Sequence, residues 1–320
     1  MITSRRTRIG ALLAAPVMLT GVAVACTPLP GAPNCSAFPD DNVWHSDISK
    51  LPVDSHSAAW LASTGATSGR KLHPDFGPSD DPNAPYGIPV TTVAGSHAKV
   101  SVRFDYADES DRVPYPLGSD IKLESGGDAH AIIVDRDACK LYETWDTRKT
   151  STGWAAGSGA VFDLRSDTLR PNGWTSADAA GLPIMPGLLR PDEVEKGTID
   201  HAVRVTFSQT AAAHVWPARH DAGSGSIAAV PPMGARFRLK ASYPLTGLRA
   251  DTQAVLKAFQ KYGLIVADNG SNWYFGGTAD NVWPEGLLDQ LKQVPASAFE
   301  AVNTSSLQVS PNSGQARHSG

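Results

Sequence analysis

The segment from Asp128 to Asp146 constrains the fold most, because its pattern predicts two β-strands joined by a tight turn. β-Branched and aromatic residues fill both arms, and polar residues 136–138 form the turn. Successive side chains of a strand point to opposite faces, so every second residue of each arm shares a face. One face of the first arm carries Asp128, His130, Ile132 and Val134. One face of the second arm carries Leu141, Glu143 and Trp145.

The length of the turn decides which face of the second arm joins these residues of the first. An even number of turn residues places Val134 opposite Leu141 and Ile132 opposite Glu143, while an odd number exchanges the faces. The even register predicts a polar cluster on a mostly apolar face, where a carboxylate and an imidazole are costly unless they are used. That cluster comprises Asp128, His130, Glu143 and Trp145.

The first 25 residues predict an export signal. Three arginines at positions 5, 6 and 8 precede an uncharged stretch, residues 9–25, that is too short and too interrupted to span a membrane. Ala23 and Ala25 suit signal peptidase, whereas the small residue before Cys26 resembles a lipobox with Ala at the position usually held by Leu. We favour lipidation of Cys26, with residues 26–34 as a tether and an exported, cell-surface or extracellular location.

Cysteine usage agrees with export. Three cysteines leave one odd, and lipidation of Cys26 would leave Cys35 and Cys139 to pair in an oxidising compartment. That disulfide would join the start of the mature domain to the hairpin turn. The alternative is two free thiols.

Charge excludes two classes of partner. Removing residues 1–25 takes away three arginines and no acids, which changes the net charge from −4 to −7. No basic run remains, so we expect no nucleic-acid partner and membrane association only through the lipid on Cys26. We expect one β-rich domain over residues 35–302 and a disordered, Ser-rich tail over residues 303–320.

Short strand-like runs separated by Gly, Pro, Asn and Asp predict a mainly β fold, an antiparallel, jelly-roll-like β-sandwich with a few short helices and long loops. Helices are expected over residues 55–61, 249–262 and 285–293. Strands are expected near residues 99–107, 129–136, 140–146, 160–164, 200–208, 213–217, 235–241, 264–268 and 272–276.

Two long loops, residues 147–159 and 165–191, are rich in Trp and Gly and are natural walls for a cleft. The chain has 8 tryptophans, which suit stacking on sugar rings as well as core packing. We expect Trp44 and Trp60 in the core. The residues expected to bind substrate from loops and polar surroundings are Trp145, Trp154, Trp174, Asp178 and Trp216.

Glu143 is the strongest candidate for a general acid, because a carboxyl group against apolar and aromatic surface has a raised pKa. Glycoside cleavage commonly needs such an acid and a second carboxylate, for which Asp128 and Asp163 are candidates. His130 could shuttle protons or orient Glu143. The alternative is that Glu143 and His130 form a buried pair that only organises the core.

Histidines and arginines offer further chemistry. His130, His201, His214 and His220 lack any recognisable ligand spacing, so we expect no metal and no other cofactor. Arg204, Arg219 and His220 could instead bind substrate, and the arginines could hold a uronic acid in a lyase. Residues 268–270, Asp-Asn-Gly, form a turn signal after a strand and are a minor site candidate.

The chain resembles a largely uncharacterised group of exported bacterial, mostly actinobacterial, proteins. The resemblance covers most of residues 35–302 and brings no catalytic assignment. We expect a carbohydrate-active enzyme, a glycoside hydrolase acting on a polysaccharide, with a glycan-binding lipoprotein and a polysaccharide lyase as alternatives. The segments that carry the resemblance are G-D-A-H-A-I-I-V-D, L-Y-E-T-W, G-W-T-S-A-D-A-A-G-L-P, I-D-H-A-V-R-V-T, V-W-P-A-R-H and K-Y-G-L-I-V-A-D-N-G.

Overall fold

The computed structural model of the chain describes residues 1 and 27–317. The expected export signal falls on residues 2–25 and the expected lipidation site on Cys26, and both lie outside the described residues. Within the described part, no helix combines the length and apolar character needed to cross a membrane.

The predicted hairpin organises a four-stranded sheet. Val134 lies opposite Leu141 and Ile132 opposite Glu143, so the even register is confirmed. The third strand continues antiparallel beyond the second arm, and the fourth runs parallel to the first arm. In sheet order the strands are β10 (Ser158–Asp163), β7 (Lys140–Trp145), β6 (Ala131–Asp135) and β4 (Val90–Val93).

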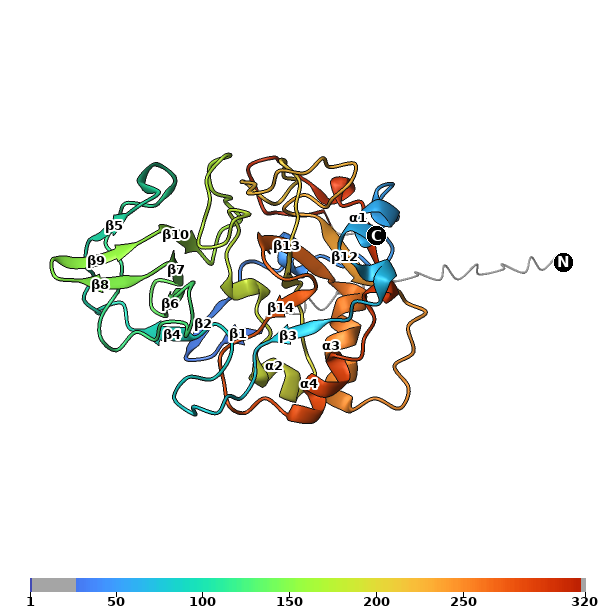
Figure 1. Ribbon diagram of the computed structural model, residues 1–320, viewed down its shortest axis with the longest axis horizontal. Helices are drawn as coiled ribbons and strands as arrows, with labels where there is room; N and C mark the ends of the chain where they lie inside the picture. The colour runs from blue at the N-terminus through green and yellow to red at the C-terminus, as the bar shows by residue number, and fades with distance from the viewer. Residues whose placement is uncertain (2–26, 318–320) are drawn as a thin grey trace.

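A six-stranded sheet forms the second large layer and carries most of the helices (Figure 1). It mixes antiparallel neighbours with two parallel pairs, β11 with β13 and β14 with β3. In sheet order its strands are β15 (Phe299–Val302), β12 (Arg236–Leu239), β13 (Leu264–Asn269), β11 (Val203–Phe207), β14 (Tyr274–Gly276) and β3 (His73–Asp75).

Two smaller sheets and short helices complete the described fold. The small sheets are β5 (Val102–Phe104), β9 (Gly153–Ala156) and β8 (Arg148–Thr150), and β1 (Pro28–Leu29) and β2 (Ala32–Ser36). The α-helices are α1 (Ser57–Ser63), α2 (Pro191–Lys196), α3 (Ala250–Lys261) and α4 (Glu285–Leu291). Single 3-10 turns are η1 (Val43–His45), η2 (Ala66–Ser68), η3 (Ala107–Glu109), η4 (Met185–Gly187), η5 (Ala296–Ala298) and η6 (Ser305–Leu307).

The four-stranded sheet is buried on both faces. Ile132 and Leu141 face the main core, which extends through the six-stranded sheet to α3 and α4. Ile133 and Tyr142 face a smaller core with Phe104 and its neighbours. A mainly β, sandwich-like fold with few short helices and long loops is therefore confirmed. Its sheets contain parallel pairs beside the antiparallel ones, since long connections allow a strand to return in the same direction.

Three helices were predicted and all three form, as α1, α3 and α4. The helix α2 was not predicted, and one expected strand, residues 213–217, is a loop with a single bridge at His214. Pro217 lacks the N–H that a strand needs there. The expected loop 147–159 is instead the β8–β9 hairpin, whose strands pair from Arg148 to Ala155.

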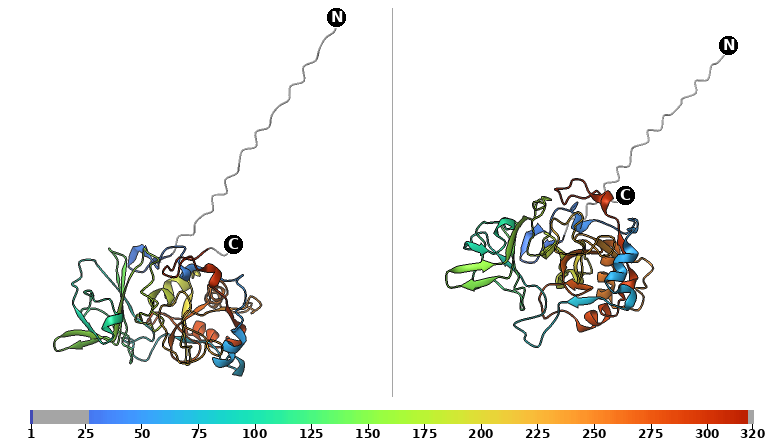
Figure 2. Two further views of the ribbon diagram at one scale, coloured as in Figure 1. Left: turned by 90° about the horizontal axis from the view of Figure 1, so that it is seen from above. Right: turned by 45° about the horizontal axis from the view of Figure 1, so that its top comes forward.

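Both expected terminal extensions belong to the folded body. Residues 27–34 contribute β1 and part of β2, with Leu29 buried, so they are not a free tether. Residues 303–317 pack beside the N-terminal segment, where Gln315 bridges to Asn42 (Figure 2). Polar tail residues are ordered because their carbonyls accept hydrogen bonds from the body, as Ser313 does from the Trp216 indole.

The expected disulfide is confirmed. Cys35 and Cys139 are bonded, with their Cα atoms 5.4 Å apart and a sequence separation of 104. Both side chains are buried in the main core, so the bond joins β2 to the turn of the β6–β7 hairpin.

Replacing both cysteines with serine should lower the free energy of unfolding by about 3–5 kcal/mol, because a loop of this length loses much entropy when it is closed. Thermal denaturation with and without reductant measures the effect. A reductant should lower the Tm of the unmodified chain and leave that of the double variant unchanged. An equal Tm for both proteins would contradict a stabilising bond.

Candidate functional site

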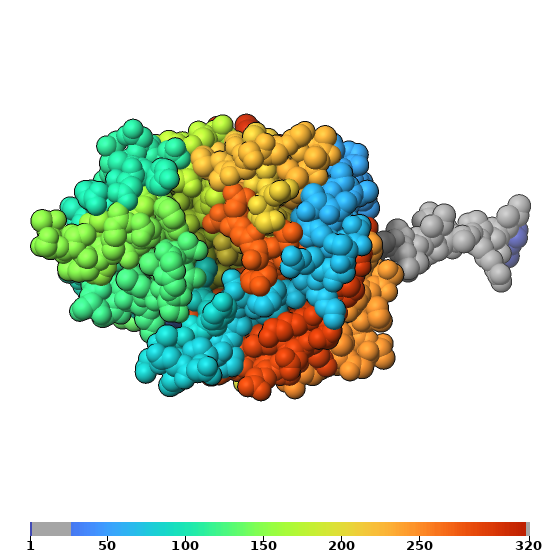
Figure 3. Space-filling model, viewed as in Figure 1, coloured from blue at the N-terminus to red at the C-terminus, as the bar shows by residue number. Residues whose placement is uncertain are grey.

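A cleft lies between the β6–β7 hairpin and the end of β13. It comprises two neighbouring cavities of about 320 and 330 Å³, here called the first and second cavity. Both are lined by Asp128, Asp268 and Asn269, so they are two halves of one cleft. Figure 3 shows this face of the molecule hollowed between the hairpin side and the segment around β13 and β14.

A buried ion pair forms the floor of this cleft. Arg204 of β11 donates from Nε to Asp178 Oδ2 over 2.7 Å, and its Nη2 donates to the other carboxylate oxygen. Asp178 is fully buried and comes from the long loop 165–191. Burial alone would lower the pKa of Arg204, but the charge and hydrogen bonds of Asp178 outweigh it and raise that pKa. The guanidinium is therefore fixed as a cation by its bidentate partner.

Asp268 is the carboxyl group with the most unusual surroundings. It lies near the end of β13, where it lines both cavities. Burial and the nearby Asp178 charge raise the pKa of Asp268 to about 7, although Arg204 opposes the shift. A hydrogen bond with Asp178 also favours its protonated form. Asp268 thus holds a proton at the junction of the two cavities up to near-neutral pH.

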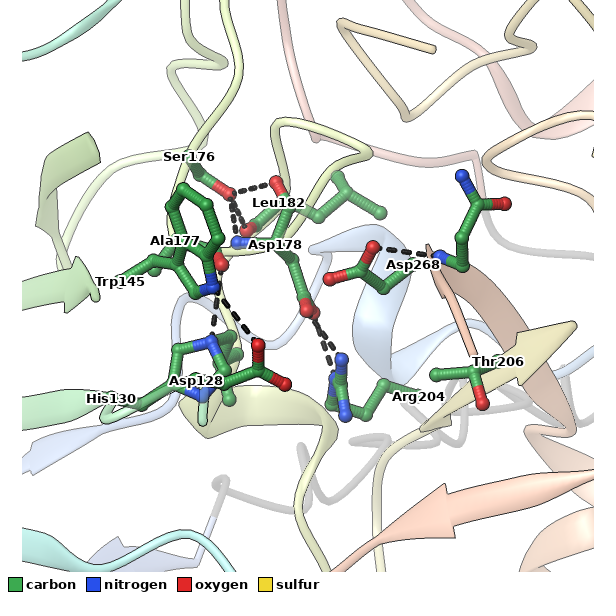
Figure 4. A network of polar contacts seen from close by, with 12 residues as sticks. Asp128, His130, Trp145, Ser176, Ala177, Asp178, Leu182, Arg204, Thr206 and Asp268 are labelled. Carbon is green, nitrogen blue, oxygen red and sulfur yellow. Dashed lines mark hydrogen bonds and ion pairs between the residues drawn. The ribbon is translucent and has the colours of Figure 1, made fainter. Parts of the chain in front are cut away.

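Asp128 supplies a second, exposed carboxylate at the same junction (Figure 4). Its Oδ1 accepts a hydrogen bond of 3.1 Å from the indole Nε1 of Trp145, which lines the first cavity. The backbone of Asp146 donates to the Asp128 carbonyl over 2.7 Å. The hairpin register therefore places Asp128 and Trp145 together, as predicted from the alternation of the two arms.

His130 holds the cleft walls together rather than serving Glu143. Its Nδ1 lies 2.5 Å from Glu124 Oε2, and its Nε2 lies 3.2 Å from the carbonyl oxygen of Ala177. Because both ring nitrogens face acceptors, the doubly protonated imidazolium satisfies both contacts. Burial lowers the pKa of His130, but the hydrogen bond and charge of Glu124 outweigh it and raise that pKa.

The prediction that Glu143 is the general acid is wrong, because its side chain does not reach the cleft. Its side chain is fully buried and lines neither half of the cleft. Its carboxylate accepts hydrogen bonds from the backbone N–H groups of Ile184 and Met185, each 2.9 Å long at the closest. Burial raises the pKa of Glu143 to about 7 against these two donors. Glu143 therefore fixes the loop 165–191 at the start of η4.

Asp163 also fails as the partner carboxylate. It pairs opposite Lys140 in the β7–β10 ladder, whereas Glu143 pairs opposite Ala160. The offset of three residues places Asp163 on the other face of the sheet. There it accepts a hydrogen bond of 3.1 Å from the Lys140 ammonium.

Of the four tryptophans predicted to line a cleft, only Trp145 does so. Trp154 lies on β9 with the Lys149 ammonium 4.9 Å from its ring centroid. Trp174 stacks with Arg170, and Trp216 donates to the Ser313 carbonyl. Trp44 and Trp60 are core residues, as predicted. Trp154, Trp174 and Trp216 therefore have partners outside the cleft.

The remaining predicted residues divide in the same way. Asp178, Arg204 and His220 line the cleft, and His220 accompanies Glu109 there at 3.7 Å. Arg219 does not, because its guanidinium donates to the carbonyls of Arg170 and Pro311. It holds the C-terminal segment in place.

Sequence reasoning missed several cleft residues and undervalued Asp268. Many lie at the ends of strands, as Asp75 does in β3 and Tyr274 in β14. Polar residues directly beside a short buried strand are the signal that could have found them. The missed residues are Asp75, Tyr86, Tyr106, Glu109, Glu124 and Tyr274.

Among the described residues, no group of three or more His, Cys, Asp or Glu side chains is arranged to hold a metal ion. No protein-family model, no curated protein and no solved structure matches this chain.

Replacing Glu143 with alanine should destabilise the protein by about 2–4 kcal/mol, because two buried backbone donors lose their acceptor. Replacement with glutamine, which keeps an acceptor oxygen, should lower the stability less. Urea denaturation of the two variants measures the difference. Equal stability of the alanine variant and the unmodified chain would contradict the structural role of Glu143.

Proposed function

We propose that the chain is an extracellular carbohydrate-active enzyme, a glycoside hydrolase that cleaves a polysaccharide in this cleft. Asp268 is the proposed general acid and Asp128 the second carboxylate. The observation that carries the proposal is that these two carboxyl groups line both cavities at their junction. Most glycoside hydrolases use two carboxyl groups that flank the scissile bond.

The proposed acid has the properties that the step requires. Asp268 is protonated near neutral pH because it is buried beside Asp178, so it can donate a proton to the glycosidic oxygen as the bond breaks. Asp128 is exposed, and it can act on the anomeric carbon or on a water molecule. The neighbouring Asp178 adds to the effect of burial on the pKa of Asp268, while Arg204 opposes it.

Two observations favour this proposal over its alternatives. A glycan-binding module needs aromatic surface but no carboxyl group that holds a proton. Asp268 is such a group, because burial and the hydrogen bond with Asp178 favour its protonated form. A uronate lyase needs a free guanidinium for the substrate carboxylate. Arg204 is paired with Asp178, and Arg219 donates to backbone carbonyls, so neither arginine supports that chemistry. Export of the chain agrees with its disulfide, which oxidising compartments maintain.

The rate of hydrolysis should fall as pH rises through about 7, because Asp268 loses the proton that it donates. Below that pH the acid is protonated and this limb of the profile is flat. Measurement of kcat/KM from pH 4 to pH 9 gives the profile. A rate that keeps rising above pH 8 would exclude Asp268 as the acid.

Asp268→Asn and Asp128→Asn should each lower kcat about 100-fold or more, the usual contribution of acid or base catalysis. Asp163→Asn is the matched control, since it changes an aspartate on the opposite face of the sheet and should retain activity. Reducing-sugar release from a panel of polysaccharides is the measurement. Full activity of Asp268→Asn would refute the assignment, and so would an inactive Asp163→Asn enzyme that remains folded.

A further inference from the structure

We infer that the substrate is a polymer that lies through both cavities and is cut internally, and that its sugars near the cut are neutral or carry amino groups. This inference rests on the proposed function. It adds two binding subsites, one on each side of the scissile bond, and a substrate class.

The cleft extends on both sides of the two carboxyl groups. The two cavities share only Asp128, Asp268 and Asn269, so each extends from the carboxyl pair over a different surface. The first continues to Thr175 and the second to Gly87. A bond cleaved at the junction therefore has room for sugar units on both sides. An enzyme that removes only terminal units needs room for a chain on one side alone.

Each cavity has its own exposed aromatic residue. Tyr106 is 54% exposed and lines the first cavity, where its ring centroid lies 6.3 Å from that of Trp145. Tyr86 is 55% exposed and lines the second, which also contains Tyr274. Aromatic faces suit stacking on the apolar faces of sugar rings. The carboxyl pair thus lies between two aromatic subsites.

The charged side chains of the cleft restrict which sugars it can bind. The cationic groups in the cleft are engaged, since Arg204 pairs with Asp178 and His130 pairs with Glu124. His220 has Glu109 as its nearest acid, at 3.7 Å. In the described part of the chain, Asp75, Asp128 and Asp268 form no ion pair. Burial raises the pKa of Asp75 against the charges of His73 and Arg204, and the nearby Glu124 and Asp128 add to the increase. A uronate carboxylate would add negative charge here and be repelled, whereas a hydroxyl or ammonium group would not.

Cleavage patterns of the full chain test the two subsites. The probes are oligosaccharides labelled at the reducing end, prepared from whichever polymer the enzyme cleaves among arabinan, β-1,3-glucan and chitosan. The unmodified enzyme should cut internal bonds. Tyr106→Ala and Tyr86→Ala should each lower kcat/KM about 3- to 10-fold and shift the preferred bond in opposite directions along the oligomer. Val282→Ala, which changes a 65% exposed residue that lines neither half of the cleft, is the control.

The outcomes separate the inference from the function on which it depends. Release of terminal units alone, or equal shifts for both tyrosine variants, would overturn the two-subsite inference and leave a hydrolase. Preference for polygalacturonate over chitosan and neutral polymers would overturn the substrate class. Cleavage of no polymer by the unmodified chain would remove the proposed function and this inference with it.

Discussion

The buried ion pair between Arg204 and Asp178 holds the two large parts of this protein together at the floor of the cleft. Arg204 belongs to the six-stranded sheet, and Asp178 belongs to the loop that covers the hairpin sheet. Ser176 fixes the same loop by donating to the Leu182 carbonyl over 2.5 Å. Loss of one partner would leave a buried charge uncompensated, at roughly 3–5 kcal/mol. The position of the cleft therefore depends on this pair.

The same pair influences the chemistry above it. Burial is the main cause of the raised pKa of Asp268, and the neighbouring Asp178 adds to it by its charge and hydrogen bond, while Arg204 opposes the shift. An isolated Asp268 at the cleft surface would have an ordinary acidity. Arg204 holds Asp178 in place, and Asp178 forms a hydrogen bond with Asp268. The contact between the two sheets is thus linked to the proposed proton donor. Proton donation and cleft geometry are consequently coupled.

Local patterning predicted the two strands of the hairpin and reduced its register to two alternatives, because alternation is a property of contiguous residues. The structure has the even register, which the sequence alone did not decide. The helices α1, α3 and α4 followed from caps and periodicity for the same reason. The role of Glu143 could not be predicted, since its face was correct but the covering loop was unknown. The parallel pairing of β11 with β13 joins segments about sixty residues apart, and no local pattern encodes it. The sequence therefore indicates Asp268 only as part of a turn and a minor site candidate.

The misassigned residues share one physical cause. Long loops contain many backbone N–H and C=O groups that must find partners when the loops pack on a core. Glu143 serves two such donors, Arg219 serves two carbonyls, and His130 serves the carbonyl of Ala177. In a chain with long ordered loops, a charged residue on an apolar strand face is therefore expected first to form hydrogen bonds with the backbone of a covering loop. Asp268, near the end of β13, differs from these residues because it lines both cavities of the cleft.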